Sequence, residues 1–112
     1  MKLVLPAPFL FGYWGSAPFP WLLILSRDYK DHAALIAHER CHQSQQRRDG
    51  TLTFWWRYLT NKSHRLDYEV EAYKVWIEVA PNDRYMLAQW LSNNYGFDLT
   101  PMGALMLLES KD

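Results

Sequence analysis

The chain has 112 residues, with 12 lysine and arginine residues balanced by 12 aspartate and glutamate residues. This length allows one domain with a modest core, and we expect residues 1–112 to form a single domain. Hydrophobic residues make up 49% of the sequence, which excludes a disordered chain, and the balanced charge argues against binding to nucleic acid.

The N-terminal part of the chain is apolar but interrupted. Prolines and glycines in residues 1–20 forbid a long helix and predict an irregular arm, with Lys2 to Leu5 as a candidate short strand. The longest apolar run, Trp21 to Leu25, is too short to cross a membrane or to form a good export signal, so we expect no transmembrane segment. Because a proline precedes this run and a polar stretch follows it, residues 21–26 predict a short strand.

A helix is predicted from Asp31, a good N-cap, to about Arg48, where Asp49-Gly50 gives a stop signal. It contains residues 38–42, which read HERCH and satisfy the HExxH pattern. Two histidines four residues apart lie on one face of a helix, so their imidazoles can bind one zinc ion, and the glutamate between them can reach a metal-bound water. Without a metal, the same histidines would be polar surface residues.

Helical patterns continue to the end of the chain. Residues 51–60 predict a short helix whose aromatic side chains enter the core, and residues 63–80 predict a longer helix that ends before a proline. Two further helices are expected, to Asn93 or Asn94 and from Thr100 to about Glu109. The fold class expected is therefore α+β and mostly helical, with a short β element packed on four or five helices. The inward residues expected on these helices are Phe54, Trp55, Trp56, Leu66, Val70, Tyr73, Ile77, Met86, Leu87, Trp90 and Leu91.

A catalytic zinc ion takes three protein ligands and keeps one position for water. The candidates for the third ligand, Glu69 and Glu71, lie about 200° apart on their helix, so only one of them can face a metal. Glu69 lies at the edge of the buried face, whereas Glu71 shares a solvated face with other charged residues. Helical phase therefore selects Glu69, and Glu71 is the alternative ligand. A carboxylate that faces the core needs a partner, and a zinc ion supplies one.

The HERCH segment, followed by Glu69 on a second helix, resembles the gluzincin clan of zinc metallopeptidases. The strings at residues 42–46 (HQSQQ) and 69–72 (EVEA) are similar to small, single-domain zincin-like peptidases of bacterial or phage origin. The resemblance covers about residues 21–80 and implies a minimal zincin-like domain. It implies that His38, His42 and Glu69 hold Zn²⁺, and that Glu39 is the general base on a zinc-activated water that hydrolyses peptide bonds.

The same resemblance implies further roles. Residues 21–26 would be the edge strand that pairs with an extended peptide or protein substrate. His64 and Tyr68 are candidate donors to the transition state, because both are close in sequence to the third ligand. In the clan, the third ligand often stands in an E-x-x-A-D pattern. Here Tyr73 replaces the aspartate, so the residue that orients a zinc histidine has to be found elsewhere.

Two classes of function are left open. The first is a zinc-dependent peptidase, and the second is a non-catalytic structural or interaction protein that keeps the zinc site for folding. Structural zinc usually has four ligands and favours cysteine, so three ligands and Glu39 favour catalysis. The single cysteine, Cys41, lies off the ligand face and is expected to be a packed small residue. It excludes an internal disulfide bond and favours a cytoplasmic protein. His32 and His64 are expected at the surface or in helix caps.

Overall fold

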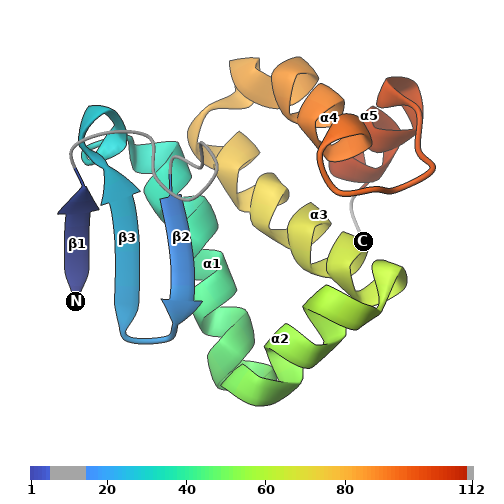
Figure 1. Cartoon of the computed structure of the whole chain (residues 1–112). Coiled ribbons are helices and arrows are strands. Elements are labelled where there is room, and N and C mark those ends of the chain that lie inside the picture. The colour runs from blue at the N-terminus through green and yellow to red at the C-terminus, as the bar shows by residue number, and fades with distance from the viewer. Residues whose placement is uncertain (6–14, 111–112) are drawn as a thin grey trace.

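The structure is a computed structural model, and it describes residues 1–5 and 15–110. A three-stranded sheet lies beside helix α1, α3 packs against α1, and α4 and α5 lie beside each other near α3 (Figure 1). The expected α+β, mostly helical fold class is confirmed. No described helix is long and apolar enough to cross a membrane. The elements are β1 (Lys2–Leu5), β2 (Gly15–Phe19), β3 (Leu22–Ser26), α1 (Ala33–Asp49), α2 (Thr51–Thr60), α3 (Lys62–Val79), α4 (Arg84–Asn93) and α5 (Pro101–Glu109), with 3₁₀ helices at Arg27–Tyr29 and Pro81–Asp83.

The sheet corrects two expectations about the N-terminal segment. Its strand order is β1-β3-β2, with β1 parallel and β2 antiparallel to β3, so β3 is the central strand. The expectation that residues 21–26 form an edge strand is therefore wrong, because segments on both sides already pair with them. The irregular arm is also corrected, since residues 2–5 and 15–19 are strands. Strand 2–5 is confirmed, and residues 6–14 lie outside the described part of the chain.

The helix boundaries follow from local capping. His32 rather than Asp31 caps α1, because its Nδ1 atom accepts a hydrogen bond of 3.1 Å from the Leu35 backbone nitrogen. Gly50 has φ +88° and separates α1 from α2 without the strain that a side chain would cause. Asn61 caps α3 by accepting from the His64 backbone nitrogen at 3.1 Å. These caps leave α1 and α3 packed against each other, joined by α2.

The core lies between the sheet and helices α1, α3, α4 and α5. Leu25 of β3 and Leu87 and Leu91 of α4 are fully buried. Two expected core residues are exposed instead: Trp56, at 73%, and Met86. Helical periodicity identifies a face, but the neighbouring elements decide how wide the buried part of that face is. The other core members are Leu23, Ala34, Leu35, Tyr73, Trp76, Ala88, Phe97, Ala104 and Leu108.

Candidate metal centre

Three buried side chains from two helices converge, as the sequence predicted. They are His38 and His42 of α1 and Glu69 of α3. The His42 Nε2 atom lies 2.7 Å from Glu69 Oε1, and the His38 Nε2 atom lies 3.9 Å from Glu69 Oε2. One ligand atom from each residue lies within 4.8 Å of the others.

This group can hold a metal ion. In a tetrahedral zinc site, bonds of about 2.1 Å place the ligand atoms about 3.4 Å apart. The two ligand-atom separations from Glu69, 2.7 and 3.9 Å, lie on either side of that value. Two imidazole nitrogens and one carboxylate oxygen are also the donor set typical of catalytic zinc. The three residues could therefore hold a metal ion.

The three side chains shift one another's pKa values. Burial lowers the pKa of His38 to about 4, so this imidazole is neutral at pH 7. Burial also acts to lower the pKa of His42, but the adjacent Glu69 carboxylate outweighs it and raises the value to about 9. Burial acts to raise the pKa of Glu69, but His42 overcomes it and holds the value at about 2. These pKa values favour an ion pair between His42 and Glu69 at pH 7.

Glu39 lies beside the group without being one of its three members. Its side chain is buried, and its Oε1 atom lies 3.8 Å from His38 Nε2. Burial raises the pKa of Glu39 to about 7, against the opposing effect of His42. Gly15 of β2 lies close by, because a Cβ atom built there would be 3.5 Å from Glu39 Cγ. The tighter contact of such an atom would be with Leu25 Cδ2, at 3.1 Å, so the missing side chain lets β2 pack closely against β3.

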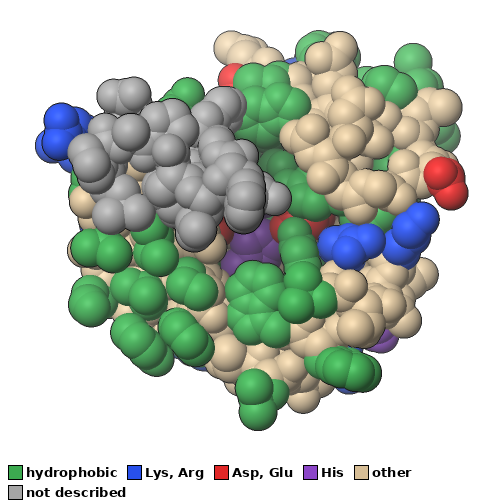
Figure 2. Space-filling model, viewed as in Figure 1, with side chains coloured by type: hydrophobic (Ala, Val, Ile, Leu, Met, Phe, Trp, Pro, Cys, Tyr) green, Lys and Arg blue, Asp and Glu red, His purple; other side chains and the backbone are tan. Residues whose placement is uncertain are grey.

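A cleft of about 420 Å³ opens onto the four residues. Figure 2 shows histidine and acidic side chains together in a hollow of the molecular surface. The metal group lines this cleft, whose volume is in the range of a small-ligand site. Its other lining residues are Gly15 and Ser16 of β2, Trp55, Tyr58 and Leu59 of α2, Arg65 of α3, and Asn94 and Tyr95 after α4.

The predicted transition-state donors are not among these lining residues. The Tyr68 hydroxyl donates to Asp49 Oδ2 at 2.7 Å, and His64 lies in the first turn of α3. Arg65 and Tyr95 line the cleft instead, and neither was predicted from the sequence. Tyr95 stands beyond the end of α4, and no periodic pattern connects it with Glu69. Only the packing of α4 against α3 brings the two together.

Tyr73 does not take over the hydrogen-bonding role of the aspartate that the resemblance places there. Its ring lies against the His38 ring, with centroids 4.6 Å apart, and its hydroxyl pairs with the Tyr95 hydroxyl at 2.5 Å. Tyr73 therefore supports His38 by packing.

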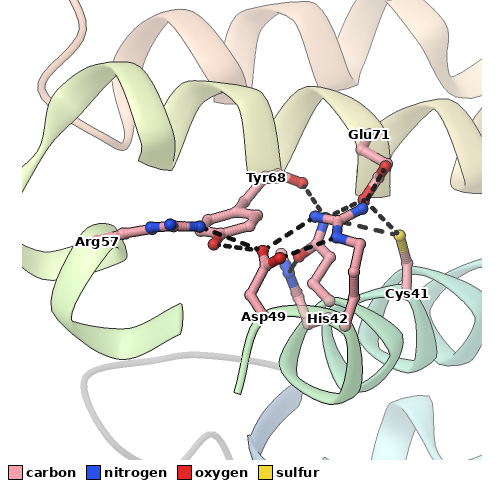
Figure 3. A network of polar contacts seen from close by, with 8 residues as sticks. Cys41, His42, Asp49, Arg57, Tyr68 and Glu71 are labelled. Atoms are coloured by element: carbon pink, nitrogen blue, oxygen red, sulfur yellow. Dashed lines mark hydrogen bonds and ion pairs between the residues drawn. The ribbon is translucent and has the colours of Figure 1, made fainter. Parts of the chain in front are cut away.

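A different residue contacts the outer nitrogen of His42. The His42 Nδ1 atom lies 2.8 Å from Gln45 Oε1, and Gln45 Nε2 donates to the Tyr68 carbonyl at 2.9 Å and to Glu71 Oε1 at 2.7 Å. Glu71, the alternative ligand, thus lies outside the metal group, since its phase on α3 directs it to another face. It also pairs with Arg48 at 3.3 Å. Figure 3 shows His42, Tyr68 and Glu71 within this network between α1 and α3.

Cys41 belongs to the same network and not to the metal group. Its sulfur lies 3.9 Å from Glu71 Oε1 and 3.8 Å from Gln45 Nε2, so its neighbours are polar, contrary to the expected apolar packing. Burial, followed by the effect of Glu71, raises the pKa of the Cys41 thiol to about 12. The thiol therefore stays protonated, and it does not offer the thiolate that binds metal.

Comparisons with protein-family models, curated proteins and solved structures found no match to this chain.

The pKa of His42 predicts how the stability of the metal-free protein depends on pH. The folded-state pKa of about 9 exceeds the ordinary value of 6.5. The stabilisation that protonated His42 contributes is therefore complete below about pH 6.5 and is lost as pH rises through 9. The pKa of Glu39 is also raised, to about 7, so its ionisation likewise lowers the stability of the protein as pH rises. We expect the free energy of unfolding in chelator to fall by about 2–3 kcal/mol between pH 6.5 and 9.5, measured by urea titration.

The control for this prediction is Glu69→Gln, which removes the charge that raises the pKa of His42. Its stability should depend much less on pH in that range. A chelated wild-type protein that is equally stable at both pH values would contradict the ion pair.

Proposed function

We propose that this protein is a zinc-dependent peptidase of the gluzincin type. The observation that most supports the proposal is Glu39, a buried carboxylate with a raised pKa beside a complete set of three ligands. A general base works best when its pKa is near the operating pH. A site that only stabilised the fold would have no need of this second acidic residue in a cleft.

The residues of the chain divide the chemistry among them. His38, His42 and Glu69 would hold Zn²⁺, which when bound acts as a Lewis acid and lowers the pKa of water. Glu39 takes the proton of the attacking water and delivers it to the leaving amine nitrogen. Arg65 lines the cleft and is a cationic donor for a carbonyl oxygen of the substrate.

Strand β2 takes over the substrate-pairing role that was expected of residues 21–26. It is an edge strand of the sheet, and its residues Gly15 and Ser16 line the cleft. The Ala17 and Pro18 carbonyls of β2 already accept hydrogen bonds from Gln46 and Trp55, so an extended peptide would pair with the backbone at Gly15 and Ser16. An extended peptide is therefore the proposed substrate.

One observation favours the alternative, a non-catalytic interaction protein. Leu52, Trp56 and Leu59 of α2 are 88%, 73% and 68% exposed. Their spacing of four and three residues places them on one side of the helix. An exposed apolar stripe of this kind is typical of a protein-binding surface.

Reconstitution with zinc tests the proposed function. We expect one zinc ion per chain by metal analysis, and cleavage of an unbiased peptide library, read by mass spectrometry, only by the zinc-loaded protein. A chelator should abolish the cleavage, and added zinc should restore it. Stoichiometric zinc with no cleavage of any peptide would support the interaction protein instead.

A further inference from the structure

The side chain of Gln45 has only one orientation that satisfies its neighbours. The side chain is 1% exposed, and its amide lies between His42 on one side and Tyr68 and Glu71 on the other. The Tyr68 carbonyl and the Glu71 carboxylate can only accept hydrogen bonds, so the amide nitrogen must face them. The Gln45 oxygen therefore faces His42.

This orientation determines which ring nitrogen carries the hydrogen when His42 is neutral. The Gln45 oxygen can only accept, and it lies 2.8 Å from His42 Nδ1, so that nitrogen must carry a hydrogen. In the neutral imidazole, the lone pair is then on Nε2. Nε2 is the atom that lies 2.7 Å from Glu69 in the metal group. The hydrogen bonds of Gln45 thus direct the lone pair of His42 toward the metal position.

We propose that Gln45 and Glu71 are positioning residues for the metal ligand His42. Glu71 holds the amide of Gln45 in one orientation, and Gln45 in turn fixes the tautomer and ring orientation of His42. Tyr73, by contrast, packs against the other histidine, His38. The inference rests on the metal site of the proposed function but not on its hydrolytic activity.

The contacts that run from Glu71 through Gln45 to His42, which we call the relay, connect the buried metal group with a charged residue at the surface. The Glu71 side chain is 47% exposed and pairs with Arg48 of α1, while the metal group is buried. Hydrogen bonds to an ionised carboxylate are stronger than those between neutral groups, so the charge of Glu71 strengthens the hold on Gln45. The backbone carbonyl of Tyr68 provides a second, neutral acceptor. Loss of Glu71 should therefore weaken metal binding less than loss of Gln45.

Zinc affinity is the primary test, measured by competition with a chromogenic chelator. Gln45→Leu should weaken zinc binding about 10–100-fold, since partners of this kind contribute that much to metal affinity. Gln46→Leu is the matched control. Gln46 is also 1% exposed on α1, but its Nε2 atom donates to the Ala17 carbonyl at 2.6 Å, away from the metal group. Its loss should lower the melting temperature and leave the zinc affinity within about threefold of wild type.

A second pair of variants separates the effect of the Glu71–Gln45 hydrogen bond on zinc affinity from the effect of net charge. Glu71→Lys places a donor against the donating amide of Gln45, so zinc should bind about three- to tenfold more weakly. Glu78→Lys makes the same change of charge at an exposed position of α3 and should have no effect. The Nδ1–H signal of His42 in ¹⁵N-edited NMR gives an independent reading. It should be protected from exchange in wild type and Gln46→Leu, and lost in Gln45→Leu.

The outcomes distinguish the two proposals. Weaker zinc binding by Gln45→Leu alone supports the relay, even if no variant hydrolyses a peptide. Equal zinc affinities for Gln45→Leu and Gln46→Leu, with an unchanged Nδ1–H signal, overturn the relay and leave the peptidase intact. Absence of zinc binding by the wild-type protein overturns both.

Discussion

Glu39→Gln is expected to keep zinc and the fold but to lose peptide hydrolysis by about 10²–10⁴-fold. Glutamine has the same shape as glutamate, but its amide cannot accept the proton of the attacking water. The metal group of His38, His42 and Glu69 is complete without this residue. The measurement is the initial rate of cleavage of a peptide identified from the library, at equal zinc content of variant and wild type.

This substitution should not destabilise the fold. Burial raises the pKa of Glu39 to about 7, so a neutral side chain at this position is at least as compatible with its surroundings as a carboxylate. Asp67→Asn, which changes an exposed carboxylate of α3 to an amide, is the matched control and should retain full activity. Zinc-dependent cleavage that survives Glu39→Gln would exclude Glu39 as the base.

The second large effect is expected for Glu69→Ala, which should weaken zinc binding by at least about a hundredfold. The substitution removes one of three ligands and leaves two histidines of α1 without a carboxylate opposite them. Glu71→Ala should keep zinc with less than about a tenfold loss of affinity, since Glu71 acts only through Gln45. Metal analysis after dialysis, followed by chelator competition, measures both.

These two glutamates provide a direct test of the helical-phase reasoning. If Glu69→Ala retained full zinc occupancy while Glu71→Ala lost it, the assignment of the third ligand would be wrong. Glu71, the alternative ligand, would then be the residue that completes the site with the histidine pair.

The sequence by itself determined the features that belong to single helices. The HERCH segment lies on α1 with its histidines on one face, because that relation depends only on helical geometry. The choice of Glu69 over Glu71 follows from phase on α3 in the same way, and the structure places Glu69 in the metal group. Helix α2, at Thr51–Thr60, has the predicted bounds because the end signals on either side of it are local.

Only the tertiary structure decided which distant segments meet. Strand β3 became central because residues 2–5 and 15–19 pair with it, and no pattern within residues 21–26 records the number of its neighbours. Gln45 shares a helix face with His42, but its acceptors come from α3, so its orientation could not be read from α1 alone. Tyr95 likewise lines the cleft only because helices far apart in sequence pack together. Local periodicity therefore identified the three candidate ligands, whereas non-local packing decided which residues contact them and which line the cleft.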